Sequence, residues 1–399
     1  MSTSNAEVAR FSLTDAREIV RDLFVADERV YWIDFLTTIV IGYLAFGLAR
    51  GPFELHLEPL WLRLVLALVA FSVQCGCFYR AVMFVHEIVH LPEKKFVAFR
   101  VVWNFLCGIP FLVPSFTYYT HLDHHRRNRF GTAHDGEYLP LASLSPWWIV
   151  VYLSQCLWVP PLAVIRFGIL TPLTWICPPL RRWIYKHASS LVMDPTYVRP
   201  LPTGTAVRDI RLQEVGCFSY LLACLIVPVV FLHRWPIPFA IQAYTTGVVL
   251  VLMNCLRTLA SHRWSSEGKE VTFVEQMLDS VTMDNVSPLA VLLNPVGLRY
   301  HATHHLFPSM PYHNIRAAHK RLLARLPADS PYRRTVANSI WPVIANSGSG
   351  RLYMVAGELI RQSSAKPTTG QFASRADVSM PPYGQIRNHP ARPAVQLAG

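Results

Sequence analysis

The chain has 399 residues, enough for one large domain or two medium ones, and 52% of them are apolar but only 16% are charged. Soluble domains usually carry about 25% charged residues, so this composition argues against an ordinary soluble protein. The net charge of +12 comes from basic residues that lie between apolar runs, as in the loops of membrane proteins. We therefore expect an integral membrane protein and no nucleic-acid partner.

The N-terminal segment, residues 1–30, is expected to be cytoplasmic. It has no basic stretch followed by an apolar one, so a cleaved signal peptide is not expected. From Asp15 to Val30, charged side chains alternate with apolar ones such as Ile19 and Phe24. This pattern predicts a helix that lies on the membrane interface.

Four stretches are apolar enough to cross a bilayer core, which needs roughly 20 residues. They run over Tyr31–Ala49, Pro59–Tyr79, Val215–Leu232 and Trp235–Leu256. Because the connections inside the first and second pair are short, the sequence predicts two helical hairpins.

Two further uncharged stretches, Val101–Thr120 and Tyr138–Ile165, contain several prolines, including the pair Pro160–Pro161. Proline removes a backbone donor and kinks or ends a helix, so we expect both stretches to be interfacial or re-entrant. The same expectation follows if the histidines described below share one site, because an even number of crossings must then separate them. Basic residues gather between Arg80 and Arg211, which predicts that both termini and the histidines face the cytoplasm.

The expected organisation is therefore an all-α membrane protein. A membrane domain covers residues 31–262, with four transmembrane helices in two hairpins plus interfacial or re-entrant helices. A cytoplasmic helical cap follows over residues 263–330, and a C-terminal extension over 331–362. Residues 363–399 are rich in Pro, Ala and Ser, which predicts disorder.

Eight of the sixteen histidines fall into three patterns, which begin at His86, His121 and His301. The patterns read HEIVH, HLDHH and HATHH, so their imidazoles share one face of a helix at i, i+3 and i+4. Eight converging imidazoles are more than one metal ion can use, which predicts a dinuclear site. Imidazole suits Fe, Zn, Cu and Ni, and the spacing alone does not choose among them.

These motifs, with LFPSMPYHN after the third, resemble the three histidine boxes of the integral-membrane fatty acid desaturases. The stretch Gly131–Pro140 is also similar to bacterial members of that family. The resemblance covers roughly residues 30–325 and implies two Fe²⁺ ions, O₂ as co-substrate, four transmembrane helices and a cytoplasmic metal site. It implies desaturation of a fatty acyl chain carried by a membrane lipid or an acyl thioester.

His262 matches a further histidine that members of this family often supply from the end of the fourth span. The implied metal ligands are His86, His90, His121, His124, His125, His262, His301, His304 and His305. Candidates to support these ligands are Asp123, Asp135, Glu137 and Asn254. In acyl-CoA members of the family, an Asn four residues before this histidine supports a water ligand. This chain has Thr258 at that position, and its Asn254 lies one turn further away. His134, His313 and His319 are expected to have structural or loop roles.

The electrons must come from another protein, because no haem-binding, flavin-binding or ferredoxin-type motif is found. The eight cysteines form no CxxC pair and lie mostly in apolar segments. The resemblance therefore implies an external donor, such as a ferredoxin or cytochrome b5 with its reductase.

Two alternatives remain at this stage. A hydroxylase or ketolase of the same superfamily, acting on an acyl lipid or carotenoid, would carry the same boxes. An intramembrane zinc protease would use the HExxH pattern at His86 with Glu87 as general base. The protease would leave both HxxHH clusters unexplained, and it needs an LDG-like aspartate where this chain has only Leu278-Asp279-Ser280.

Overall fold

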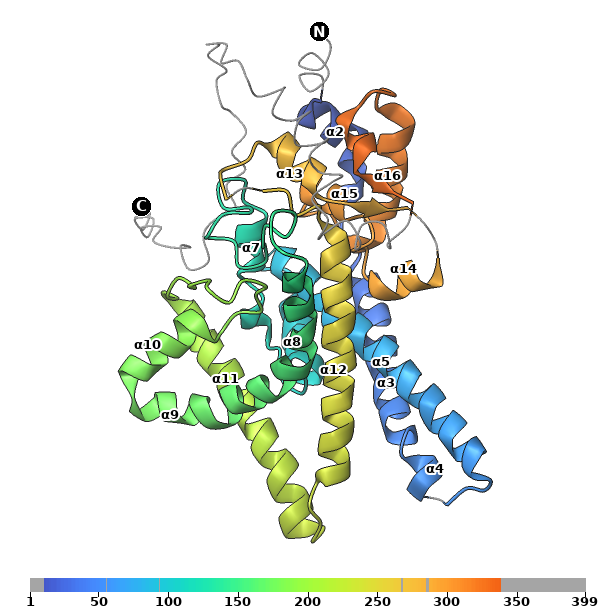
Figure 1. Ribbon diagram of the computed structural model, residues 1–399, viewed down its shortest axis with the longest axis vertical. Helices are drawn as coiled ribbons and strands as arrows, with labels where there is room; N and C mark the ends of the chain where they lie inside the picture. The colour runs from blue at the N-terminus through green and yellow to red at the C-terminus, as the bar shows by residue number, and fades with distance from the viewer. Residues whose placement is uncertain (1–10, 55, 93, 267, 285–286, 339–399) are drawn as a thin grey trace, which may run out of the picture.

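The computed structural model describes residues 11–338, except 55, 93, 267 and 285–286, and this part of the chain is mostly helical (Figure 1). The expected disordered tail lies outside the described residues, as does the C-terminal extension beyond residue 338. Five described helices are long and apolar enough to cross a membrane, whereas the sequence predicted four. These five segments are Glu28–Leu48, Leu60–His90, Trp147–Ile176, Thr205–Phe231 and Ile237–Ser261. The protein therefore has the architecture of a multi-pass membrane protein.

The first hairpin pairs α3 (Glu28–Leu48) with α5 (Leu60–His90), and the short α4 (Gly51–Glu54) lies between them. The Asp27 side chain accepts a hydrogen bond from the backbone N–H of Arg29 and so caps α3. A helix of 31 residues is about 46 Å long, well beyond the roughly 30 Å of a hydrocarbon core. The last turns of α5, which carry His86 and His90, can therefore extend past the apolar region.

The second hairpin consists of α11 (Thr205–Ile226), which continues as a π-helical turn over Val227–Phe231, and α12 (Ile237–Ser261). Helix α11 begins ten residues before the predicted span, at Thr205 rather than Val215. The tight turn around His233 and Arg234 is present as predicted, with the Arg234 N–H bonded to the Pro228 carbonyl.

The prolines at 160 and 161, which led us to expect an interfacial or re-entrant stretch, do not end the helix. Helix α8 (Trp147–Val164) runs through both prolines, continues as a π-helical turn over Ile165–Leu170 and then as α9 (Thr171–Ile176). The prolines remove backbone donors and the following turn widens, but ending the helix in apolar surroundings would expose more unpaired backbone groups. In Figure 1, α8 lies beside α12, whereas α9 and the following α10 (Pro178–His187) turn away from it.

The stretch Val101–Thr120 does not form a spanning helix, as expected. It contains the end of α6 (Val97–Trp103), a π-helical turn over Asn104–Gly108 and a 3₁₀ turn over Ser115–Thr117. The apolar helical part is too short to cross a bilayer, which needs roughly 20 residues.

The N-terminal segment differs from the single interfacial helix that was predicted. It forms α2 (Leu13–Ile19) and a 3₁₀ turn over Arg21–Phe24 before α3 begins. Its apolar side chains Ala16 and Val20 are fully buried against the C-terminal helix α16 (Tyr312–Arg325). The alternating pattern therefore reflects packing on another part of the protein.

The chain after α12 gathers at the end of the bundle where the histidines lie (Figure 1). It contains α13 (Phe273–Asp279), α14 (Pro288–Leu293), α15 (His301–Leu306), α16 and a 3₁₀ turn over Pro331–Thr335. Two short strands, β1 (Thr282–Met283) and β2 (Val336–Ala337), pair in parallel, with Thr282 opposite Val336.

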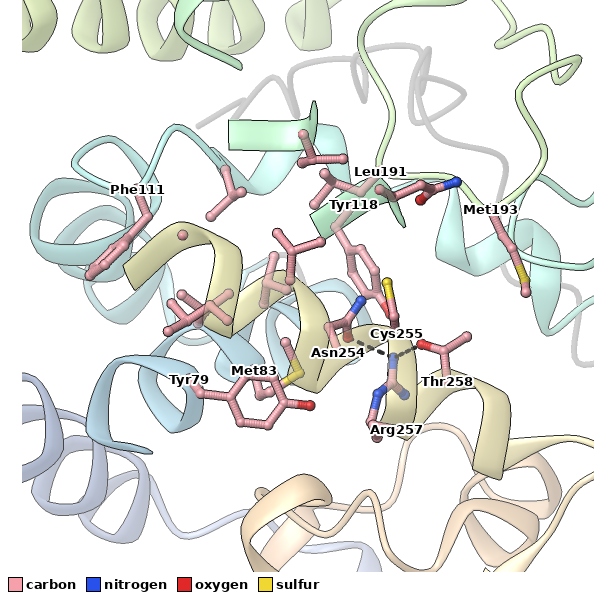
Figure 2. Close-up of a pocket in the computed structure, with 18 of the residues that line it drawn as sticks. Tyr79, Met83, Phe111, Tyr118, Leu191, Met193, Asn254, Cys255, Arg257 and Thr258 are labelled. Atoms are coloured by element: carbon pink, nitrogen blue, oxygen red, sulfur yellow. Dashed lines mark hydrogen bonds between the residues drawn. The ribbon is translucent and has the colours of Figure 1, made fainter. Parts of the chain in front are cut away.

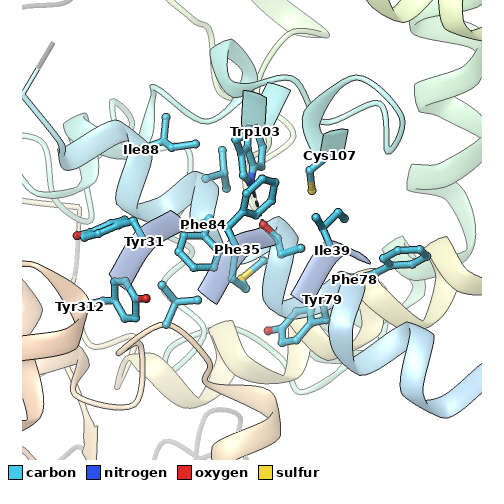
Figure 3. Packing of buried hydrophobic residues seen from close by; sticks show 14 of the residues in the cluster. Tyr31, Phe35, Ile39, Phe78, Tyr79, Phe84, Ile88, Trp103, Cys107 and Tyr312 are labelled. Carbon is cyan, nitrogen blue, oxygen red and sulfur yellow. Dashed lines mark hydrogen bonds between the residues drawn. The ribbon is translucent and has the colours of Figure 1, made fainter. Parts of the chain in front are cut away.

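A buried aromatic cluster connects α3, α5 and α6 with α16 (Figure 3). The ring of Tyr31 contacts Tyr312 edge-on, with a centroid distance of 5.0 Å. The hydroxyl of Tyr31 also donates to Glu87 Oε2 at 2.7 Å, and the backbone N–H of Tyr312 donates to the same oxygen at 3.1 Å. This packing fixes the end of α5 that carries His86 and His90.

Candidate metal centre

Each histidine box lies on a helical turn that aims its imidazoles to one side. His86 and His90 lie on the last turns of α5, which ends at His90 just before Pro92. The second box forms the one-turn helix α7 (His121–His124) with His125 following it, and the third box forms α15. His262 is the residue directly after α12.

All nine predicted ligands come together in two groups. Within each group the potential ligand atoms lie within 4.8 Å of one another. The first group, called group 1 below, consists of His86, His90, His121, His125 and His304. The second, group 2, consists of His124, His262, His301 and His305. The second and third boxes thus each contribute to both groups.

The spacing between the ring nitrogens suits a bound metal ion. The Nε2 atom of His262 lies 3.1 Å from that of His124 and 2.9 Å from that of His301 in group 2. In group 1, His125 Nε2 lies 3.0 Å from the Nε2 atoms of His121 and His304. For a nitrogen–metal bond of about 2.1 Å, two ligands at a right angle would be about 3.0 Å apart.

Three carboxylates accept hydrogen bonds from the opposite ring nitrogens. Asp135 Oδ2 lies 2.8 Å from His124 Nδ1, and Glu137 Oε2 lies 3.0 Å from His121 Nδ1. Asp279 Oδ2 lies 3.1 Å from His262 Nδ1. Such partners fix the tautomer and the ring orientation of a metal-binding histidine.

These bonds decide where the lone pairs point in group 2. Because Nδ1 of His124 and of His262 each donates its proton to a carboxylate, the neutral form of each ring, which is the form that binds metal, presents a bare lone pair at Nε2. Two lone pairs facing each other at 3.1 Å repel unless a cation lies between them. The donor set therefore fits a metal ion.

Burial keeps most of these imidazoles neutral, which metal binding requires. Burial and the neighbouring imidazoles hold the pKa of His301, His304 and His305 well below the usual value. Burial likewise lowers the pKa of His262 to about 4. Burial also acts to lower the pKa of His124, but the negative charge of Asp135 outweighs it and raises this pKa.

Four buried ring nitrogens at the end of α5 indicate that group 1 also fits a metal ion. Neither nitrogen of His86 or of His90 has a hydrogen-bond partner among the described residues, although all four atoms are buried. Buried polar atoms without partners are costly. Two whole imidazoles in this state therefore indicate that group 1, too, fits a bound metal ion.

Two of the four predicted supporting residues do not contact a histidine ligand. Asp123 instead accepts from Arg126 and Arg129 at 2.7 Å each, so its charge holds the loop after the second box. Asn254 accepts from the Arg257 guanidinium, at 3.1 Å from Nη2. Asp135 and Glu137 do contact ligands, and Asp279 was missed.

The remaining predicted histidines lie outside both groups. His134 is exposed, His313 accepts from the backbone N–H of Asp27, and His319 Nδ1 lies 2.7 Å from the Tyr332 hydroxyl. Glu87 points into the aromatic cluster, where Tyr31 and the Tyr312 N–H occupy one of its oxygens. It is therefore poorly placed to act as the general base of a zinc protease.

An apolar cavity of about 200 Å³ reaches the metal centre from the membrane helices (Figure 2). Its walls come mainly from α5, α8 and α12, and His86 and Glu137 line it as well. Helices α8 and α12 approach closely along it, because Gly247 faces the ring of Pro160. A long apolar substrate could therefore lie between these helices with one part beside group 1.

Comparison with known proteins agrees with this geometry. Residues 59–336 match the family model described as "Fatty acid desaturase". The chain belongs to this family. It is also similar to a ceramide hydroxylase of Caulobacter vibrioides, at 34% identity over 325 residues that cover 81% of this chain and 89% of the relative.

Membership makes the protein an oxidoreductase of the desaturase and hydroxylase superfamily, as the histidine boxes predicted. The expectation of desaturation itself is less well supported. The similar protein is named for hydroxylation, so the comparison favours the hydroxylase that the sequence left as an alternative.

Proposed function

We propose that the protein is an O₂-dependent lipid hydroxylase, with ceramide as the first substrate to test. The observation that carries the proposal is the 34% identity to a ceramide hydroxylase over most of both chains. An apolar cavity that reaches the grouped histidines supports it, because a lipid chain needs such a path to the reacting centre.

The proposed cofactor is a pair of Fe²⁺ ions, one in each histidine group. The all-imidazole donor set suits iron, and family membership supports iron over the other metals that imidazole binds. When bound, iron would supply the redox chemistry that activates O₂ for attack on an aliphatic C–H bond.

The chain's own residues would orient the ligands and the substrate. Asp135, Glu137 and Asp279 would hold the Nδ1 protons of their histidines and so keep each Nε2 lone pair directed inward. The walls of the cavity would exclude water and place one particular carbon next to the metal centre, which decides the site of oxidation.

The overall reaction balances only with two electrons from outside. A C–H bond, O₂, two electrons and two protons give C–OH and one water. We propose that a separate ferredoxin or cytochrome with its reductase supplies the electrons.

We further propose that α3, α5, α11 and α12 cross the membrane, whereas the segment from α8 to α10 enters and returns on the same side. Group 1 combines His86, at the end of α5, with His304, beyond α12. An even number of crossings must separate them, and α11 with α12 already provides two. By the positive-inside rule the metal centre and both termini would face the cytoplasm.

The mass of the product tests the reaction. The protein is expressed in a bacterial host that receives ceramide, and the lipids are analysed by mass spectrometry under ¹⁸O₂. We expect a product 18 units heavier than the substrate, or 16 units heavier in ordinary O₂. Desaturation, the second candidate because of the family match, would give a product two units lighter without label.

Metal analysis tests the cofactor. Wild-type protein should contain about two iron atoms per chain, and His125→Ala should lose iron and most of the activity because a coordination position is opened. His134→Ala is the matched control, since His134 is exposed and belongs to neither group. Full iron content and product formation in His125→Ala would refute the assignment.

A further inference from the structure

The cavity that reaches group 1 is apolar except for a few polar side chains near the metal centre. Arg257, Asn254 and Thr258 contribute from α12, and Tyr118 and Glu137 from the segments around the second histidine box. Figure 2 shows Arg257 with its two hydrogen bonds to Asn254 and Thr258. Within the described residues, Arg257 forms no hydrogen bond with a histidine of either group, so orienting the metal ligands does not explain its place in the cavity.

Arg257 is a buried cation whose hydrogen bonds are incomplete. Only 6% of the residue is exposed. Its Nη2 atom donates to Asn254 Oδ1 at 3.1 Å and to Thr258 Oγ1 at 3.0 Å, both neutral oxygens. Its Nε atom is buried and has no hydrogen-bond partner among the described residues, although Tyr79, Tyr118 and Glu137 also interact with the guanidinium. A buried charge in this state is costly unless another group completes its bonding.

Glu137 provides the opposite polarity in the same cavity. Its Oε2 atom accepts from His121 Nδ1 at 3.0 Å and from the Tyr118 hydroxyl at 3.3 Å. Its Oε1 atom is buried without a partner. The cavity thus contains a donor and an acceptor whose bonding is incomplete, and both lie within a mostly apolar wall.

We propose that this pair recognises the secondary amide of an N-acyl lipid, with Arg257 donating to the carbonyl oxygen and Glu137 Oε1 accepting from the amide N–H. The inference rests on the proposed function in taking the substrate to be a lipid. It adds the chemical group that is recognised and the residues that recognise it.

The polarity of the site separates an amide from other acyl head groups. An ester or thioester has a carbonyl oxygen but no N–H, so it would leave Glu137 Oε1 without a donor. A free carboxylate likewise has no N–H to donate to Glu137 Oε1. An amide offers one acceptor and one donor and has no net charge, so it completes both bonding sets at once.

The position of the site also limits which carbon can react. His86 of group 1 and Arg257 line the same cavity, so an amide held at Arg257 places the carbons a few bonds away next to the metal centre. The apolar remainder of the chain would extend between α8 and α12. Oxidation is therefore expected near the amide and not in the middle of the acyl chain.

A binding experiment tests the proposal without turnover. A fluorescent C6 ceramide is bound to the detergent-solubilised protein in the absence of electron donor, and unlabelled competitors displace it. The competitors are C6 ceramide and two analogues, one with an ester in place of the amide and one with an N-methyl amide. Wild-type protein should bind C6 ceramide about 10-fold or more tightly than either analogue, since each analogue leaves a buried acceptor unpaired.

Arg257→Met should weaken the binding of C6 ceramide by about 10- to 100-fold, the usual effect of losing a hydrogen bond from a buried charged group. Arg211→Met is the matched control, because Arg211 is exposed on α11 and should bind as the wild type does. If Arg257→Met does not yield folded, iron-containing protein, Arg257→Lys is used. It keeps the charge but cannot form the same set of bonds, and we expect an intermediate loss.

Two results would overturn the inference. One is wild-type protein that binds the ester and the amide equally, and the other is a folded Arg257 variant with unchanged affinity for C6 ceramide. Product analysis distinguishes a failure of the amide site from a failure of the proposed hydroxylase function. A wild type that forms no product 16 units heavier refutes hydroxylation, whereas normal product from an Arg257 variant with unchanged affinity refutes only the amide site. In the product of the wild type, fragmentation should place the new hydroxyl close to the amide.

Discussion

At the scale of single residues, the imidazoles are oriented by carboxylates that come from different parts of the chain. Asp135 and Glu137 follow the second box closely, but Asp279 belongs to α13. The backbone positions Asp279, because its carbonyl accepts from the Arg263 N–H at 2.7 Å and Val281 N–H donates to Ser261 at 2.8 Å. Hydrogen bonds from His262 and Ser265 counteract its burial and keep the pKa of Asp279 below the usual value. The carboxylate is therefore charged at neutral pH.

Removing this carboxylate should weaken the metal site of group 2. In Asp279→Ala the His262 ring loses the partner that fixes its Nδ1 proton, so we expect metal affinity to fall about 10- to 100-fold. The measurement is the iron content of purified protein after dialysis against a graded series of chelator concentrations. Asp123→Ala is the matched control, since Asp123 contacts Arg126 and Arg129 and no metal-ligating histidine. Equal iron retention in both variants would contradict the role of Asp279.

The contrast between these two aspartates shows what the sequence could reveal about the site. The boxes predicted eight of the nine grouped histidines, because helical spacing fixes which side chains share a face, and the family resemblance added His262. Asp123 lies inside a box but faces Arg126 and Arg129, a direction that spacing does not determine. Asp279 is 17 residues from its partner His262, and only the bridge between His262 and Ser280 brings it there. No local pattern in the sequence encodes that contact.

At the scale of helices, hydropathy located the spans of both hairpins but misjudged how α8 continues. The prolines at 160 and 161 were expected to kink or end the helix, as they normally do in water. In apolar surroundings unpaired backbone groups cost more, so the helix persists and widens to a π-helical turn instead. The contacts between helices could not be predicted from the sequence either, because they depend on which helix faces meet in the folded protein.

The contact between α3 and α5 gives a matched test of such packing. A Cβ atom at Gly42 would lie 2.6 Å from the ring of Phe78, which is almost fully buried, whereas a Cβ at Gly47 would meet nothing within 4 Å. Gly42→Ala should therefore force the helices apart and destabilise the protein by about 1–3 kcal/mol. Gly47→Ala, on the same helix, should be neutral or stabilising by up to about 1 kcal/mol.

Thermal unfolding in detergent, followed by fluorescence, compares the two glycine variants with the wild type. We expect a lower midpoint for Gly42→Ala and an unchanged or higher one for Gly47→Ala. Equal midpoints would mean that the α3–α5 interface can relax around the added methyl group.

At the scale of the whole molecule, the two histidine groups make the membrane topology testable. The histidine groups bring the ends of α5 and α12 together, so the proposed topology puts the turn between α11 and α12 on the opposite side of the membrane. None of the eight cysteines is exposed, which leaves a low background for labelling by an impermeant maleimide. His233→Cys should react in intact cells, whereas Arg127→Cys and Arg182→Cys should react only after the membrane is permeabilised.

Arg182→Cys decides the path of the fifth candidate span. It lies on α10, just beyond the segment Trp147–Ile176. Labelling of this variant from outside would mean that α8 and α9 cross the membrane completely, and the re-entrant path would then be wrong.

The last prediction follows from what the whole chain contains and from the reaction it is proposed to perform. Hydroxylation consumes two electrons per turnover, and the sequence has no haem-binding, flavin-binding or ferredoxin-type motif that could store or relay them. The cysteines cannot substitute, because they form no CxxC pair and all eight are buried or half-buried. Purified protein with O₂ and ceramide should therefore form at most one product molecule per metal centre. Adding a reduced ferredoxin with its reductase, or a cytochrome b5 system, should restore continuous turnover. Product that accumulates beyond one equivalent without any donor would show that the electrons have another source.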